Sequence, residues 1–121
     1  MIKHLTRDFE SYANQTRNGV GFWFGRDLQH LLVYTEWRNF TKVINKAKTA
    51  CETAGHLIVD HFVDVNKTIT MPKGASKEIH DFMLTRFACC LIVQNGDPQK
   101  EPIAFAQNSL FLKFRKKRKI L

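Results

Sequence analysis

No long hydrophobic run occurs in this sequence. Its apolar stretches all stop short of the roughly 18 residues that a helix needs to cross a bilayer. The first residues, Met1 to Asp8, also contain no apolar segment of the kind that a secretory signal requires. We therefore expect a cytoplasmic protein without a membrane span.

Cysteine is also scarce, and its spacing indicates neither redox nor metal chemistry. Cys51 stands alone, whereas Cys89 and Cys90 are neighbours inside an apolar run. An odd number of cysteines without a CxxC pair argues against both a disulfide framework and a structural zinc site. All three thiols are therefore expected to be reduced and buried.

The familiar catalytic motifs are missing. The sequence contains no P-loop, no GxGxxG and no GxSxG. His56, Asp60 and His61 are close in sequence, but their spacing matches no known set of metal ligands. Cys89 or Cys90 would be a poor nucleophile, because apolar neighbours disfavour the reactive thiolate. We expect no enzyme activity, no metal and no cofactor.

Large apolar side chains, by contrast, are plentiful. Ten Phe and two Trp occur among 121 residues, and the composition is 44% hydrophobic and 25% charged. These proportions are typical of a globular chain with a genuine core and not of a disordered one. The length suits one domain, and no repeat divides it. We expect a single small α+β domain over residues 1–108, followed by a basic helix or tail over 109–121.

The clearest predicted helix covers residues 35–54. Thr35 is expected to cap it, Glu36 to lie in its first turn near the positive end of the dipole, and Gly55 to end it. Its apolar stripe, at alternating steps of three and four, consists of Trp37, Phe40, Ile44, Ala47, Cys51 and Ala54.

The remaining elements, several helices and one or two β-hairpins, follow from turn residues and apolar spacing. They are helices over 3–13 and 26–32, a hairpin over 15–25, strand or irregular core segments over 57–65, a hairpin over 66–84, a helix from Thr85 to Asn95-Gly96, and a final helix over 103–114. Periodicity cannot separate helix from strand over 87–93, which is apolar on every side. Helix is favoured there because Thr85 offers a cap.

The net charge of +8 is concentrated at the carboxy-terminal end. Six of the nineteen basic residues form one cluster: Lys113, Arg115, Lys116, Lys117, Arg118 and Lys119. Residues 1–112 hold thirteen basic and eleven acidic side chains, so the body is nearly neutral. A basic tail suits a phosphate backbone, and it also serves as a solubilising end. Phe111 and Phe114 in this tail could stack on single-stranded bases or pack the last helix onto the body.

A helix, a break and a second helix occur in the order of a helix-turn-helix. The first covers 26–32 and the second 35–54, and the second helix of that motif reads the major groove. Arg38, Lys42 and Lys46 recur every four residues on the second helix, away from the apolar stripe. They are therefore candidate phosphate contacts.

Asn39 and Asn45 on the same helix are candidates for base-edge contacts. The alternative reading is a solvated outer face, which any amphipathic helix has. The short first helix and the absence of a glycine in the turn favour this alternative.

Four strings carry a resemblance to a known family. They are YTEWRNF over 34–40, AKTACETAGH over 47–56, DHF over 60–62 and TRFACCLIVQNGDP over 85–98. In order and spacing, over about residues 20–108, the chain resembles the DNA damage-inducible protein D family. It is more distantly similar to the Bro amino-terminal domain of viral and phage antirepressors, whose start looks like Gly25-Arg26-Asp27-Leu28 with Leu31-Leu32.

The chain departs from the family pattern at three places. Val33 stands where the family usually has glycine before the tyrosine, and Cys90 stands where an aromatic residue is common. The match fades from Asn108 onward, whereas family members continue into a longer carboxy-terminal region. We therefore expect residues 109–121 to be truncated relative to the family, in a natural truncation, a frame-shifted gene or an expressed fragment.

The resemblance implies a cytoplasmic bacterial protein of the DNA-damage (SOS) response, associated with DNA or with recombination proteins. It offers no catalytic residues to transfer. Two functions stay open. One is a DNA-associated module that uses helix 35–54 and the basic tail. The other is an antirepressor-like regulator that binds a repressor or a strand-exchange recombinase without contacting DNA.

Overall fold

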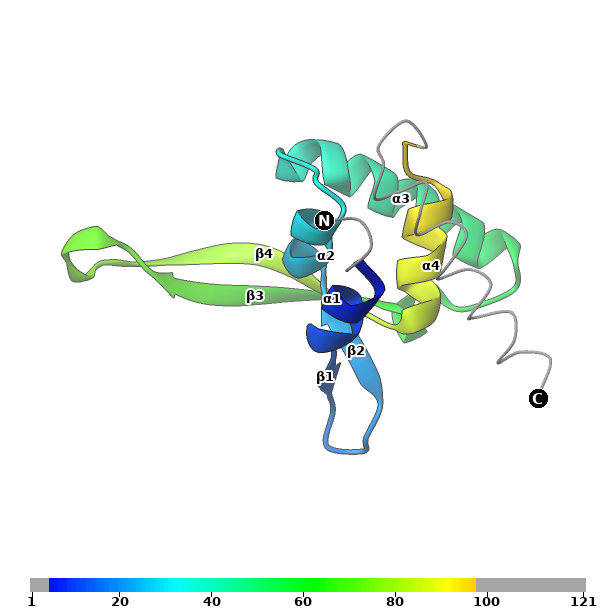
Figure 1. Cartoon of the computed structure of the whole chain (residues 1–121), viewed down its shortest axis with the longest axis horizontal. Helices are drawn as coiled ribbons and strands as arrows, with labels where there is room; N and C mark the ends of the chain where they lie inside the picture. Colours follow the sequence, from blue (N-terminus) through cyan, green and yellow to red (C-terminus); the bar gives the residue numbers. More distant parts are fainter. Residues whose placement is uncertain (1–4, 98–121) are drawn as a thin grey trace.

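The computed structural model describes residues 5–97, with side chains from Asp8 onward. Helices pack against one face of a small antiparallel sheet (Figure 1). The helices are α1 (Leu5–Ser11), α2 (Gly25–Leu31), α3 (Trp37–Thr53) and α4 (Arg86–Gln94), and the strands are β1 (Asn14–Gln15), β2 (Gly21–Phe24), β3 (Phe62–Thr70) and β4 (Ser76–Leu84). Two short 3-10 turns, η2 (Ile58–Asp60) and η3 (Pro72–Gly74), lie on either side of β3. This confirms the predicted single α+β domain.

The sheet has the strand order β1-β2-β4-β3, with every neighbouring pair antiparallel. The strands β3 and β4 pair along their whole length, from Phe62 opposite Leu84 to Thr70 opposite Ser76. Strand β2 pairs with β4 only near the end of β4, at Met83 and Leu84. The rest of the β3–β4 hairpin therefore has no neighbouring strand among the described residues.

The core lies between the helices and one face of the sheet. Trp23 of β2 stacks on Phe9 of α1, with ring centroids 4.4 Å apart, and its indole N–H donates to the Phe9 carbonyl at 2.7 Å. Fully buried side chains from all four helices and three strands complete it, among them Leu28, Phe40, Ile44, Phe62, Leu84 and Ile92. Four of the ten phenylalanines, Phe9, Phe40, Phe62 and Phe82, are buried in this core.

Helix α3 buries most of the apolar stripe that its sequence predicts. Phe40, Ile44, Ala47 and Cys51 are fully buried, whereas Trp37 is only partly buried. Ala54, also predicted for the stripe, is exposed, because the helix ends at Thr53 and Ala54 is its C-cap. Gly55, at φ 88°, ends the helix as predicted. Two hydrogen bonds typical of a glycine C-cap close the last turn, from Gly55 N–H to the Glu52 carbonyl and from His56 N–H to the Cys51 carbonyl.

The prediction for the start of α3 was wrong. The helix begins at Trp37, Thr35 does not cap it, and Glu36 precedes the first turn as an N-cap without a side-chain hydrogen bond. The cause lies in the preceding residue. Tyr34 is held to Gln29 of α2 by two hydrogen bonds, of 3.1 Å from its N–H and 2.9 Å to its carbonyl. These hydrogen bonds fix the backbone immediately before Thr35 against α2, and α3 begins two residues after Thr35.

Most other predicted elements are confirmed. The hairpin over 15–25 corresponds to β1 and β2, and the apolar segment after Thr85 is the buried helix α4. Thr85 caps α4 by accepting the Ala88 N–H at 3.2 Å. Strand β3 begins earlier than the predicted hairpin, at Phe62, and the stretch before it forms η2. The predicted final helix over 103–114 lies outside the described residues.

The β3–β4 hairpin extends far from the helices (Figure 1). From Thr68 to Glu78 every residue of this hairpin is exposed. No helix in the described part of the chain is long and apolar enough to span a membrane.

Candidate nucleic-acid interface

The three cations predicted on α3 form one exposed stripe. Arg38, Lys42 and Lys46 are all exposed, and the buried residues of α3 lie on another side of the helix. Successive cations are about 6 Å apart along the helix axis. Helix α3 holds no carboxylate before Glu52, so its first four turns are purely cationic. We call these three residues the α3 stripe.

Only one ion pair touches the stripe among the described residues. The guanidinium of Arg38 lies 3.7 Å from the Glu36 carboxylate, and both side chains are exposed. Such a pair is weak and readily exchanged for another anion. Lys48 is not part of this surface, because its ammonium lies 4.8 Å from the centre of the Phe82 ring.

The connection from α2 to α3 turns at Val33. This residue has φ 62°, in the left-handed region that valine rarely occupies. The resembled family has glycine at this position, which the backbone conformation explains. The order of helix, turn and helix is therefore present, with a strained residue in the turn.

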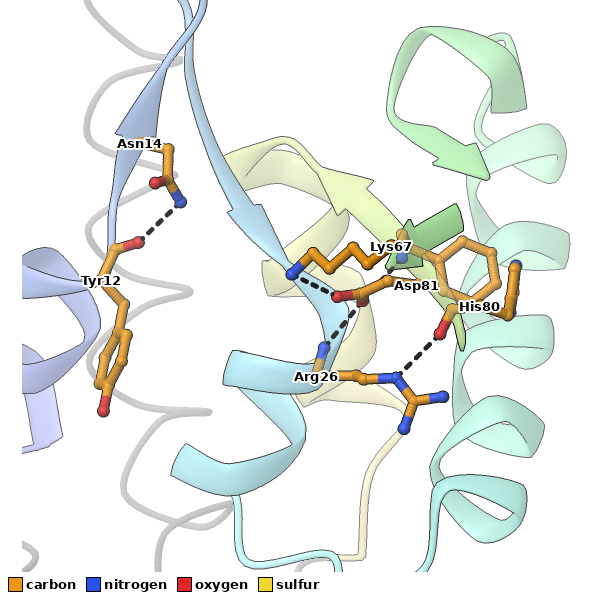
Figure 2. Close-up of polar contacts among 7 residues, drawn as sticks. Tyr12, Asn14, Arg26, Lys67, His80 and Asp81 are labelled. Carbon is orange, nitrogen blue, oxygen red and sulfur yellow. Dashed lines mark hydrogen bonds and ion pairs between the residues drawn. The ribbon is translucent and has the colours of Figure 1, made fainter. Parts of the chain in front are cut away.

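A buried charge cluster, which the sequence analysis missed, fixes the base of the β3–β4 hairpin (Figure 2). Asp81 of β4 is 0% exposed. Its Oδ1 accepts the N–H of Arg26 at 3.0 Å, in the first turn of α2. Its Oδ2 lies 2.8 Å from the ammonium of Lys67 on β3. One carboxylate thereby joins both strands of the hairpin to α2.

Two aromatic rings complete this cluster. The Arg26 guanidinium lies 4.2 Å from the centre of the Trp37 ring on α3, and its Nε donates to the His80 carbonyl at 2.8 Å. The Lys67 ammonium lies 3.4 Å from the centre of the Phe24 ring. These cation–π contacts strengthen when the cation is partly desolvated. The hairpin base is therefore tied to α2, α3 and β2.

Gly25 allows this close packing. An added Cβ would lie 3.1 Å from Asp81 Oδ1, 3.3 Å from the Trp37 ring and 3.4 Å from Phe82. Sequence alone offered one signal for the cluster: an ionisable residue, Asp81, inside the largely apolar end of β4. Its partners could not be inferred, because Arg26 is 55 residues away.

The histidine pair considered as a metal site is an aromatic cluster. The rings of His56 and His61 are nearly perpendicular, 5.6 Å apart, and both pack on Phe87. Nδ1 of His61 is 2.7 Å from Oγ1 of Thr85, the cap of α4. Burial, and secondarily the neighbouring His56, lowers the pKa of His61, against a smaller raising effect of Asp60. Within residues 5–97 no three His, Cys, Asp or Glu side chains are grouped to hold a metal.

The three cysteines are free and buried, as predicted. Burial raises the pKa of the Cys51 thiol, raises that of Cys89 well above its usual range, and raises that of Cys90 to about 11. Thiols in this state carry little thiolate at neutral pH.

An apolar hollow lies where the β1–β2 loop meets the start of β3. Its volume is about 140 Å³. Val20 and Val63 at its rim are 52% and 43% exposed. The lining consists of Thr16, Val20, Phe22, Asp60, His61, Val63, Met83, Leu84 and Thr85.

The predicted tail cations lie outside the described residues. They are Lys113, Arg115, Lys116, Lys117, Arg118 and Lys119. Their relation to the α3 stripe therefore stays a prediction.

The sequence matches a known protein family over most of its length. Residues 13–109 match the N-terminal domain of the BRO family, and the chain belongs to this family. It is 40% identical over 108 residues to DNA damage-inducible protein D of Escherichia coli (strain K12). The predicted family is thereby confirmed.

The alignment with this relative covers 89% of the chain and 39% of the relative. The chain thus spans about two fifths of the length of the curated relative. No solved structure matches the chain.

Proposed function

We propose that this chain is a non-enzymatic, DNA-associated module of the bacterial DNA-damage (SOS) response that modulates repair or recombination. The name of the Escherichia coli relative, DNA damage-inducible protein D, supports the link to DNA damage. The α3 stripe is the observation that supports direct contact with DNA. It concentrates three exposed cations on one helix of a nearly neutral body.

In this proposal the outer side of α3 lies against the sugar-phosphate backbone. Arg38, Lys42 and Lys46 neutralise phosphates and release the counterions that surround them, which supplies affinity without base specificity. Asn39 and Asn45 are exposed on the same helix, and we propose them as the contacts to base edges.

Binding to duplex and single-stranded DNA, measured against salt concentration, tests this proposal. We expect the slope of log K against log salt to lose up to about 2.7 in magnitude for duplex when Arg38, Lys42 and Lys46 are all changed to Gln. Each single variant, Arg38→Gln, Lys42→Gln or Lys46→Gln, should lose up to about 0.9 of the slope. Arg17 is an exposed cation in the β1–β2 loop, so Arg17→Gln is the matched single-charge control. Absence of salt-dependent binding to both forms of DNA would refute the proposal.

The basic tail is a second proposed contact. Deleting residues 113–121 removes six cations. If they bind phosphates, the slope falls by about 0.9 per contact on duplex and about 0.7 on single strands. An unchanged slope would assign binding to the body alone.

The apolar hollow at Val20 and Val63 favours a second function, that of a regulator that binds a repressor or a strand-exchange recombinase. Exposed valines around a hollow fit an apolar side chain of a protein partner better than they fit DNA. A pull-down from DNA-damaged cells that survives nuclease and is lost in Val63→Asp would support it. Recovery of partners only through DNA would count against it.

A further inference from the structure

The distal part of the β3–β4 hairpin is an arm without structural support. We call residues 68–77 the arm. All of them are exposed, and neither edge of the arm pairs with another strand within the described part of the chain. A two-stranded hairpin alone is marginally stable in water, and open edges favour aggregation. No residue of the arm is part of the described core, so the arm is available for a role in binding.

The base of the arm, in contrast, is fixed on both faces of the ribbon. The ion pair of Lys67 with Asp81 joins the strands on one face. On the other face, Nε2 of His80 lies 2.7 Å from the Asp64 carboxylate, and the His80 ring contacts Trp37 of α3. These contacts hold the arm in a defined direction relative to the body (Figure 1).

The arm is cationic. It contains Lys73 and Lys77 and no carboxylate, and neither lysine forms an ion pair with the described residues. Glu78 follows the arm, opposite Thr68 in the register. In that register Lys77 lies opposite Ile69, so one face of the arm pairs a cation with an exposed apolar side chain.

The tip combines exposed apolar residues with proline. Met71 is exposed and directly precedes Pro72. Lys73 and Gly74 then turn the chain with φ 72° and 82°. Met and Pro side chains, flanked by cations, are the wedges with which minor-groove proteins separate base steps and kink a duplex. At about 3.4 Å per residue, the stretch from Lys67 to Met71 spans about 14 Å. This exceeds the minor-groove depth of about 7.5 Å.

We propose that the arm enters the minor groove of duplex DNA, where Met71 and Pro72 wedge between base pairs and Lys73 and Lys77 contact the flanking phosphates. This inference rests on the proposed function, because it requires that the chain binds DNA. The charge of the arm favours DNA over a second copy of the chain. Pairing of two arms would bring four lysines together, and like charges across a strand pair are unfavourable.

Bending of a duplex of about 25 base pairs, labelled at its ends for energy transfer, tests the wedge. We expect the full chain to bend it by an amount within about 20–90°. The double variant Met71→Ala with Pro72→Ala should keep the salt slope of binding and lose most of the bend. Thr68→Ala, an exposed arm position on the other face from Ile69 and Lys77, is the control and should bend like the parent.

The salt dependence of DNA binding tests whether Lys73 and Lys77 contact phosphates. Lys73→Gln with Lys77→Gln should reduce the magnitude of the slope by up to about 1.8. A 2-aminopurine base at the bent step should brighten with the parent chain and not with the wedge variant. Circular dichroism melts establish that each variant is folded.

The outcomes separate the two proposals. Salt-dependent binding in which neither double variant changes bend, slope or fluorescence overturns the arm inference and leaves the proposed function intact. A change in oligomeric state on arm mutation, measured by sedimentation without DNA, also overturns it, because the arm then binds a second copy. Absence of any DNA binding by the parent removes both.

Discussion

Val33 has a backbone conformation, with φ 62°, that is unfavourable for valine and suits glycine. A non-glycine residue in the left-handed region costs about 1–3 kcal/mol. Replacement by glycine relieves this strain. It also increases the conformational entropy of the unfolded chain, which destabilises the folded state by about 0.4–1 kcal/mol. Since Val33 is 46% exposed, its replacement sacrifices little burial. We expect Val33→Gly to raise the free energy of unfolding by about 1 kcal/mol.

Urea denaturation of the parent, Val33→Gly and Val33→Ala measures this effect. Alanine keeps the Cβ that makes the left-handed region unfavourable, so it should gain less than glycine. Equal gains from both would attribute the effect to loss of the valine side chain and not to the backbone.

The pair Lys67–Asp81 should respond unequally to removal of either partner. Asp81 is 0% exposed, whereas the Lys67 side chain is 33% exposed. Lys67→Met therefore leaves a buried carboxylate without its cation, at a cost of about 3–5 kcal/mol. Asp81→Asn leaves an ammonium that still reaches water and should cost less, about 1–3 kcal/mol. Chemical denaturation of both variants gives the comparison, and an Asp81→Asn variant that is the less stable of the two would contradict it.

His61 gives folding stability a dependence on pH. Its pKa is lower in the folded chain than its unfolded value of 6.5, because burial disfavours the charged ring. The unfolded chain thus binds the proton first as pH falls. The contribution of His61 is therefore fully present above pH 6.5 and declines as pH falls from there toward the folded pKa.

Unfolding free energies measured between about pH 7.5 and 5 test this sign. We expect His61→Gln to show a shallower decline than the parent below about pH 6.5. His56→Gln, which removes the neighbouring positive charge, is an informative second variant. It should leave a smaller decline that ends at a higher pH, because the pKa of His61 in the folded chain then lies closer to its unfolded value.

At the scale of elements, the helices were the most predictable part of the fold. Apolar spacing locates α3, and local chemistry locates its end at Gly55 and the start of α4 at Thr85. These features depend on residues within a turn or two of each other. The wrong cap at Thr35 shows the limit of this reasoning, because apolar spacing does not reveal the two hydrogen bonds that hold Tyr34 to Gln29 of the preceding helix.

The charge cluster and the arm were beyond prediction for related reasons. A period-two pattern indicates a strand, but it does not tell whether another element covers that strand. Asp81 meets Arg26 only after the whole chain has folded. The stripe, in contrast, follows from helical spacing alone, and its exposure was predictable although its role stays a proposal.

Shortening the arm should leave stability almost unchanged. Replacing Ile69–Lys77 by Asn-Gly joins Thr68 to Glu78, which already face each other, through a favoured two-residue turn. The removed residues are exposed and outside the core, so we expect a change below about 1 kcal/mol in urea denaturation. A larger loss would mean that the arm stabilises the body.

At the scale of the whole molecule, the described residues carry almost no net charge, but their basic side chains are unevenly distributed. Eleven basic and ten acidic side chains nearly cancel over residues 5–97. Helix α3 carries four cations, Arg38, Lys42, Lys46 and Lys48, against one carboxylate, Glu52. On the β3–β4 hairpin three lysines match three carboxylates in number, but Lys73 and Lys77 lie together in the arm, which holds no carboxylate. Local concentration, more than net charge, therefore supports the DNA hypothesis for the body.

The placement of the two tryptophans gives the molecule a pair of built-in optical probes. Trp23 is stacked in the core, whereas Trp37 lies where Arg26, His80 and Phe82 meet at the hairpin base. Fluorescence of Trp23 should report unfolding of the whole domain, whereas fluorescence of Trp37 should report whether α3 stays in contact with the hairpin base. Variants that keep one indole each would thus let fluorescence distinguish loosening of the hairpin from loss of the fold.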